Sequence, residues 1–151
     1  MKNKFFLTKL IVIFLLIFEY PQAISKQSDN FEKGLTLFQE KEFEKSKILF
    51  ERDIVFNPKN ERSYLYLAKI FNKGENDLEE EINLNNVLLL NPQNDEAIYM
   101  LVLLKIKQSD YDLAAELIDK FVLVCKSFCS KENEIKEKFK ILIPENAKNN
   151  N

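Results

Sequence analysis

The chain has no histidine and no tryptophan, and only two of its 151 residues are glycine and two are cysteine. Histidine is the commonest general base and metal ligand, and two thiols without histidine do not complete a tetrahedral zinc site. No glycine-rich phosphate loop is present. Scarce glycine is typical of helices and disfavours a turn-rich β fold. The sequence therefore predicts a helical protein that is not an enzyme and holds no metal or cofactor.

Arginine is also scarce, since Arg52 and Arg62 are the only two. The chain has 22 basic and 24 acidic residues, a net charge of −2, and the two signs alternate along the sequence. Nucleic-acid-binding proteins usually carry a basic stripe. The charges are therefore interpreted as solvated helix surfaces, and no nucleic-acid partner is expected.

One pattern in the chain repeats. The segment 56–60, Phe-Asn-Pro-Lys-Asn, returns 34 residues later at 90–94 as Leu-Asn-Pro-Gln-Asn. Three rows can be aligned on this period: Asn30, Lys33, Gly34, Leu37, Ser46, Phe50 and Pro58; Tyr64, Leu67, Ala68, Phe71, Glu80, Leu84 and Pro92; Ile98, Leu101, Val102, Lys105, Ala114, Ile118 and Lys126. A period of 34 residues with proline at the join resembles the tetratricopeptide repeat family. The resemblance covers about residues 28–126.

The resemblance implies an all-α fold, a right-handed α-solenoid of three helix-turn-helix repeats. The apolar periodicity and the turn residues predict helices that begin near residues 29, 43, 61, 77, 95 and 111. A seventh helix over 131–143, amphipathic and stopped by Pro144, would cap the apolar end of the array. The repeat domain is then 26–143, followed by a disordered tail over 144–151.

Several residues mark where these helices begin and end. Asn60, Asn94 and Asp110 are expected to cap the helices that follow them. Gly74 is expected to end a helix in the left-handed conformation. The small-residue position of the repeat holds Gly34, Ala68 and Val102, of which Val102 is bulkier than this family prefers.

The first 25 residues resemble a secretory signal. Leu10–Phe18 is an uninterrupted run of nine apolar residues, shorter than the roughly 20 that span a bilayer. Lysines precede it, and a small-x-small pattern at 23–25 predicts cleavage before Lys26. The chain is therefore expected to be exported to the periplasm. The alternative is a retained N-terminal anchor in the inner membrane, which would be the chain's only contact with a membrane.

The resemblance also implies a binding surface, because the first helices of these repeats line a concave groove that takes a segment of another protein. The groove positions are Phe31, Leu35, Phe38, Arg62, Leu65, Lys69, Lys73, Tyr99, Leu103 and Ile106. Most are apolar, which disfavours the grip on a terminal carboxylate found in some relatives. An amphipathic helix or an extended segment fits better. Two alternatives stay open: core packing for the first three residues, and contact with the cap helix for the last three.

Cys125 and Cys129 are the only cysteines. If the sixth helix continued through both, their Cβ atoms would be about 6 Å apart, beyond the disulfide value of about 3.8 Å. If that helix ends near Lys126, Cys129 can turn back, and an oxidising compartment favours a bond. Both outcomes are left open, with the disulfide slightly preferred.

The composition, rich in Lys, Asn, Ile and Phe, is interpreted as that of a bacterial protein from an AT-rich genome. Together with the signal and the repeats, it predicts a protein–protein interaction adaptor of the bacterial cell envelope. The alternative is a structural subunit that associates with copies of itself, because three repeats are near the minimum for a stable array.

Overall fold

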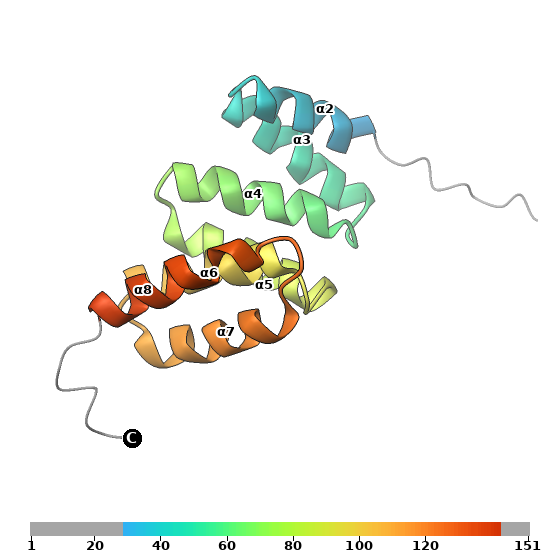
Figure 1. Cartoon of the computed structure of the whole chain (residues 1–151). Coiled ribbons are helices and arrows are strands. Elements are labelled where there is room, and N and C mark those ends of the chain that lie inside the picture. Colours follow the sequence, from blue (N-terminus) through green and yellow to red (C-terminus); the bar gives the residue numbers. More distant parts are fainter. Residues whose placement is uncertain (1–28, 143–151) are drawn as a thin grey trace, which may run out of the picture.

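In a computed structural model, which describes residues 29–142, the chain forms a row of antiparallel helix pairs (Figure 1). The pairs are α2 (Asp29–Gln39) with α3 (Phe43–Phe56), α4 (Glu61–Lys73) with α5 (Asp77–Leu90), and α6 (Asp95–Lys107) with α7 (Tyr111–Val124). A short 3₁₀ helix, η1 (Cys129–Lys131), and α8 (Glu132–Leu142) follow. The predicted solenoid with a C-terminal cap helix is confirmed. The predicted signal, 1–25, and tail, 144–151, lie outside the described residues.

The two helices of each repeat meet at a small residue and a large one. A Cβ added to Gly34 in α2 would lie 2.9 Å from Cε1 of Phe50 in α3. One repeat further on, the same two positions hold Ala68 and Leu84, and then Val102 and Ile118, all of them buried. From the first repeat to the second, the residue on the first helix grows from Gly to Ala while its counterpart on the second helix shrinks from Phe to Leu. Val102 is larger again, although Ile118 is as large as Leu84, and both are buried in the core.

The turns inside the repeats share one backbone conformation. Lys41, Glu75 and Ser109, spaced 34 residues apart, have φ angles of 64°, 54° and 61°. The prediction for Gly74 was wrong by one residue, because Gly74 has φ −87° and Glu75 takes the left-handed position. A non-glycine residue there costs roughly 1–2 kcal/mol. All three repeats keep this turn although none has glycine at the position, where glycine would adopt a positive φ with the least strain.

The carboxylates at the starts of α4 and α6 hold the loops between repeats. Glu61 accepts a hydrogen bond of 3.0 Å from the side-chain amide of Asn91. Asp95 accepts bonds of 2.6–2.9 Å from three successive backbone N–H groups, those of Lys126, Ser127 and Phe128. These bonds lower the pKa of Asp95 against the raising effect of its burial, which is the largest single influence on it. In the second and third repeats, the start of the first helix is thereby tied to the loop that follows the second helix of the same repeat.

A buried carboxylate near the end of α3 holds the loop between the first two repeats. Asp53, fully buried in α3, accepts hydrogen bonds from the amides of Asn57 at 3.1 Å and Asn60 at 2.6 Å and from the hydroxyl of Ser63 at 2.5 Å. Asn60 occupies the predicted N-cap position of α4, but its side chain makes no cap bond to the helix. Its counterpart Asn94 does cap α6, through the Ala97 N–H at 3.0 Å.

The hydrophobic core is divided into two clusters. The N-terminal cluster is centred on Phe31 and Phe50 and includes Leu67 and Ile70 from α4. The C-terminal cluster begins at the other face of α4 with Leu65 and Ala68, runs through α5, α6 and α7, and ends under α8 at Ile135. Helix α4 thus contributes to both clusters, and the first repeat has a core largely of its own.

The cap helix is joined to α7 by a disulfide. Helix α7 ends at Val124, so Cys125 begins the connection, and it is bonded to Cys129 in η1 with their Cα atoms 5.2 Å apart. This separation is usual for disulfides. The geometry matches the alternative in which the helix ends before the cysteines. Among residues 29–142, none of the helices is both long and apolar enough to cross a bilayer.

Candidate functional site

A cavity of about 370 Å³ opens between the first helices of the three repeats. We call it the groove cavity. Its apolar wall is formed by Phe38 from α2 and by Tyr99, Met100 and Leu103 from α6, and its polar wall by Lys69, Asn72, Lys73, Glu80 and Glu96. Because α2, α4 and α6 all contribute, a segment lying in the cavity would contact all three repeats.

The two lysines of the groove cavity differ in their partners. Lys69 forms an ion pair of 2.8 Å with Glu96, and both side chains are about a quarter exposed; its Nζ also lies 4.7 Å from the centre of the Tyr66 ring. Lys73 is exposed, and its Nζ lies 5.3 Å from the centre of the Phe43 ring. Acidic groups of a partner are therefore expected to pair mainly with Lys73.

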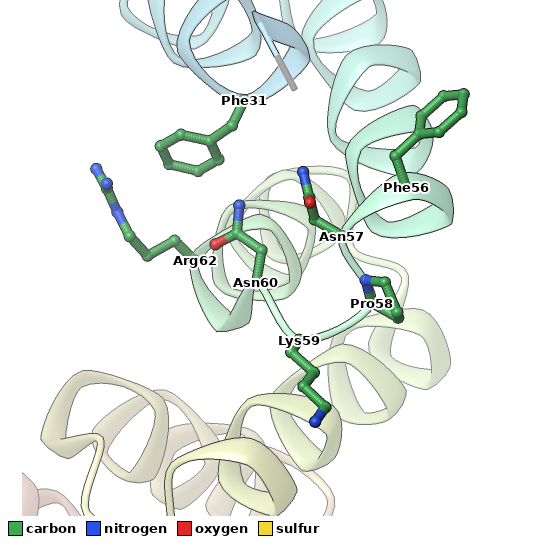
Figure 2. A pocket seen from close by; sticks show the side chains of 7 residues that line it. All are labelled: Phe31, Phe56, Asn57, Pro58, Lys59, Asn60 and Arg62. Atoms are coloured by element: carbon green, nitrogen blue, oxygen red, sulfur yellow. The ribbon is translucent and has the colours of Figure 1, made fainter. Parts of the chain in front are cut away.

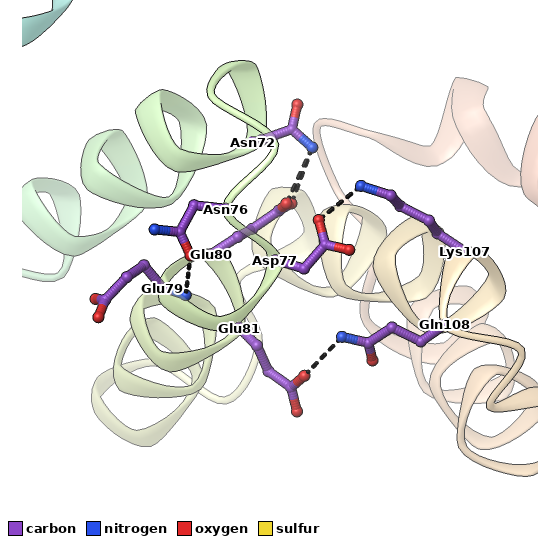
Figure 3. A network of polar contacts seen from close by, with 8 residues as sticks. All are labelled: Asn72, Asn76, Asp77, Glu79, Glu80, Glu81, Lys107 and Gln108. Atoms are coloured by element: carbon purple, nitrogen blue, oxygen red, sulfur yellow. Dashed lines mark hydrogen bonds and ion pairs between the residues drawn. The ribbon is translucent and has the colours of Figure 1, made fainter.

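A buried carboxylate forms part of the floor. Glu80, at the start of α5, is 1% exposed, and both of its oxygens lie 3.1 Å from the side-chain nitrogen of Asn72 (Figure 3). Burial raises the pKa of Glu80, and the hydrogen bond from Asn72 only partly opposes that effect. The repeat pattern places Ser46 and Ala114 at this position in the other repeats. Glu80 thus places a carboxylate in the lining of the groove cavity, at a position where the other two repeats have a small residue.

Beside Glu80, charged groups join α5 to α6 (Figure 3). Asp77 pairs with Lys107 at 2.6 Å, as Figure 3 shows. Glu81 pairs with Lys105, also at 2.6 Å. Gln108 donates to Glu81 at 3.1 Å. The hydrogen bond from Lys105 lowers the pKa of Glu81. These contacts cross from the second repeat to the third, so they hold the two walls of the groove cavity in register.

The cap helix fixes Tyr99 in the apolar wall. Its hydroxyl donates a hydrogen bond of 2.9 Å to Glu134 of α8, and its ring lies 5.8 Å from that of Phe128. Burial, followed by the bond to Glu134, raises the pKa of Tyr99. Bonds from Lys131, Tyr99 and Lys138 lower the pKa of Glu134 from 4.5 to about 2.

This pKa predicts that the cap is weakened in acid. A carboxyl group whose pKa is depressed by folding stabilises the folded state above its unfolded pKa, and that contribution disappears as the pH falls through the folded value. The Glu134 contribution is therefore expected to be complete above about pH 4.5 and to be lost towards about pH 2. Thermal unfolding at a series of pH values should show the difference between wild type and Glu134→Gln shrinking over this range. Glu137→Gln, at an exposed position of the same helix, provides the control variant.

The ten predicted groove residues separate in the structure. Five of them line the groove cavity: Phe38, Lys69, Lys73, Tyr99 and Leu103. Three are buried in the core instead, so their predicted place on the groove surface is corrected: Phe31, Leu65 and Ile106. Leu35 is half-buried against the N-terminal cluster, and Arg62 lines a different cavity.

Sequence reasoning missed four residues of the groove cavity: Asn72, Glu80, Glu96 and Met100. Spacing held a signal for two of them, since Glu96, Met100 and Leu103 follow one helical face with steps of four and three. Glu80 gave none, because acidic residues in a first helical turn are ordinarily exposed. Among the described residues there is no cluster of three or more Cys, Asp or Glu side chains that would hold a metal ion.

Comparison with solved structures identifies the architecture. The second TPR domain of human RPAP3, in complex with an HSP70 peptide, covers 79% of this chain and 96% of its own with a TM-score of 0.65 at 14% identity. The fold is that of tetratricopeptide repeat (TPR) domains. The TPR2B domain of yeast Sti1, in complex with pHsp70, has a TM-score of 0.70 at 16% identity over 77% of this chain and 97% of that one.

A third TPR domain, that of Sgt2 from Aspergillus fumigatus, matches 83% of this chain and 84% of its own with a TM-score of 0.67 at 16% identity. No family model matches the sequence, and no curated protein does either. The likeness therefore concerns the arrangement of the TPR helices. It does not extend to the side chains that line the groove cavity.

Proposed function

We propose that this TPR domain is a protein–protein interaction adaptor that binds a segment of another protein in the groove cavity. The observation that carries the proposal is the cavity itself, formed by the first helices of all three repeats and lined by an apolar wall facing a polar one. The Sti1 and RPAP3 domains with the same fold are complexes with pHsp70 and with an HSP70 peptide. An amphipathic helix or extended segment with apolar anchors fits this lining, because such segments bind through a few anchors in a groove.

We further propose that the adaptor is exported and works in the cell envelope of a bacterium. The support is the sequence of residues 1–25, with its lysines, its run of nine apolar residues and its small-x-small site. N-terminal sequencing of the native protein tests the proposal. Cleavage predicts a terminus at Lys26, and an intact Met1 in the membrane fraction would mean a retained anchor instead.

Substitutions in the groove cavity test the binding site. Crosslinking capture from the native envelope should fail with Leu103→Asp, which places a charge in the apolar wall, and should weaken with Lys73→Glu, which reverses an exposed charge. The control is Leu78→Asp, because Leu78 is a leucine in the first turn of α5 that is 68% exposed and outside the cavity. Capture by this variant should equal that of wild type.

Circular dichroism melting separates loss of binding from loss of fold. Lys73→Glu is expected to change the free energy of unfolding by less than about 0.5 kcal/mol, the usual range for exposed positions. If Leu103→Asp melted far below wild type while Lys73→Glu captured partners normally, Leu103 would belong to the core and the binding surface would lie elsewhere.

A further inference from the structure

The three loops that follow the second helices lie along one side of the solenoid. We call this side the join edge; it comprises residues 55–60, 89–94 and 123–128. In Figure 1 it is the right-hand side, where α3, α5 and α7 end and where α4, α6 and α8 begin. Helix α2 also begins there, so the residues that precede Asp29 are attached to the join edge.

Large apolar side chains are exposed at one register of the join edge. Val55, Leu89 and Leu123 occupy the same position in the three repeats and are 75%, 80% and 84% exposed. Phe56, next to Val55, is 71% exposed. Single exposed apolar residues are ordinary on protein surfaces. Recurrence at one register places one exposed apolar side chain at the same edge in each repeat, which single scattered residues would not do.

The charges of the join edge are mainly positive. Its loops contain no Asp or Glu, whereas Lys59 and Lys126 are exposed. Two carboxylates that follow the loops, Glu61 and Asp95, are engaged by them through the hydrogen bonds described above. Asp29, at the start of α2, is paired with Lys33 at 2.6 Å. Glu51 and Asp119, one helical turn before Val55 and Leu123, are exposed as well. The edge therefore combines exposed apolar tips with loops whose own charged residues are basic.

A cavity of about 510 Å³ opens at the same edge, beside the start of α2 (Figure 2). Its lining includes the aromatic residues Phe31 and Phe56 and the basic residues Lys59 and Arg62. The guanidinium carbon of Arg62 lies 4.3 Å from the centre of the Phe31 ring. Figure 2 shows Phe56 and Lys59 pointing away from the Phe31–Arg62 pair, and Phe31 itself is buried, so the basic groups of this lining face outward in different directions.

We propose that the join edge binds the surface of a lipid bilayer that carries anionic headgroups. The apolar side chains lie on three separate helix ends with polar loops between them, so they form no continuous groove for a peptide. A fluid interface needs no matching shape, and it accepts apolar tips below the headgroups while lysines stay at headgroup level. Anionic headgroups complement Lys59, Arg62 and Lys126.

The chain outside the described residues agrees with this orientation. The apolar run Leu10–Phe18 is separated from Asp29 by residues 19–28, which span at most about 35 Å when extended. A membrane-inserted N-terminus, during export or in a retained anchor, would hold the join edge near the bilayer. The groove cavity is a separate site, so a bound partner would not compete with the membrane.

Vesicle co-sedimentation of the purified protein tests the proposal, with its N-terminus sequenced so that all variants are compared in the same form. The probes are vesicles of phosphatidylglycerol and phosphatidylethanolamine and vesicles of phosphatidylcholine alone. Leu89→Gln/Leu123→Gln should bind the anionic vesicles at least about tenfold more weakly than wild type. Lys59→Gln/Lys126→Gln should lose the preference for anionic vesicles and much of its dependence on salt.

The matched control is Leu78→Gln/Ile141→Gln, which changes two residues that are 68% and 79% exposed near the opposite side of the solenoid, at the start of α5 and the end of α8. It should bind vesicles as wild type does. The proposal is overturned if the leucine variant binds vesicles normally, because the N-terminal segment alone would then explain binding, or if the control loses as much. Light scattering tests the other possibility, that a second copy of the chain binds the join edge. The proposal is also overturned if the wild-type protein binds no vesicles but forms a dimer that only the leucine variant abolishes.

Discussion

Asp53→Ala is expected to lower the free energy of unfolding by about 3 kcal/mol. The carboxylate is fully buried and accepts hydrogen bonds from Asn57, Asn60 and Ser63. Removing it leaves these donors without their acceptor at the boundary between the first two repeats, and an unpaired buried polar group costs roughly 1–3 kcal/mol. The melting temperature should fall by about 10 °C in a domain of this size.

A double substitution taken from the next repeat tests whether the unpaired donors cause this loss of stability. At the positions equivalent to Asp53 and Ser63, the second join has Val87 and Ala97, both fully buried. Asp53→Val/Ser63→Ala replaces both the acceptor and one donor with apolar groups, and such paired replacements are often near neutral. Asn60 would then be free to cap α4 as Asn94 caps α6. We expect the double variant to recover most of the stability that Asp53→Ala loses.

The control is Asp119→Ala, which removes an exposed carboxylate from α7 and should change the free energy of unfolding by less than about 0.5 kcal/mol. Denaturant unfolding followed by circular dichroism gives all four values. The account of this network fails if Asp53→Ala is no more destabilising than Asp119→Ala, or if the double variant is the least stable of the set.

Gly34→Leu is expected to cost about 3 kcal/mol, because it overfills the contact between α2 and α3. Even a single added Cβ would lie 2.9 Å from the Phe50 ring. That ring cannot move freely, since Tyr66 stacks on it at 5.2 Å and Phe31 lies at 5.6 Å. Ser46 also donates a buried hydrogen bond of 2.8 Å to the carbonyl of Gly34, so the backbone of α2 is held as well.

Gly34→Ala gives a sharper test, because two effects oppose each other. Alanine is better than glycine inside a helix by about 1 kcal/mol, and the close approach to Phe50 acts in the other direction. We expect a net loss in wild type. In a Phe50→Leu background, which reproduces the Ala68 and Leu84 pair of the second repeat, the same substitution should become stabilising. A double-mutant cycle measures this change of sign.

Gly74, the other glycine, is the natural control. A Cβ added there would lie 3.7 Å from its nearest atoms, and φ is −87°, so Gly74→Ala should be neutral or slightly stabilising. If Gly34→Ala behaved like Gly74→Ala with Phe50 in place, the packing argument would be wrong.

The sequence allowed the helix boundaries to be predicted because the 34-residue period repeats both the apolar stripe and the turn residues. The prediction for Gly74 failed within a turn, where Glu75 takes the left-handed conformation instead. The other predictions that failed depended on contacts between helices. The side chain of Asn60 is drawn from a cap bond by Asp53, a carboxylate buried only because α3 and α4 pack together. Phe31, Leu65 and Ile106 lie at helical spacings that also fit a groove, yet neighbouring repeats bury them.

In the groove cavity too, some residues could be predicted from the repeat pattern and others could not. Lys69, Lys73, Tyr99 and Leu103 follow from the repeat pattern and the face of each first helix. Glu80 does not, because its burial results from where Asn72 and α6 lie around it. Periodicity identifies the face that a helix presents, but the depth of a side chain depends on neighbours that are far away in sequence.

The division of the core into two clusters has a consequence for how the domain opens. Segments with cores of their own can unfold locally at less than the global free energy, and among the described residues the first repeat packs on the rest mainly through α4. The groove cavity spans this boundary, with Phe38 on one side and Leu103 on the other. A segment bound across it would have to leave before the first repeat could detach. Binding should therefore slow hydrogen exchange in α2 and α3 more than in α7. The apparent affinity should also rise with the fraction of molecules in which the first repeat is packed against the others.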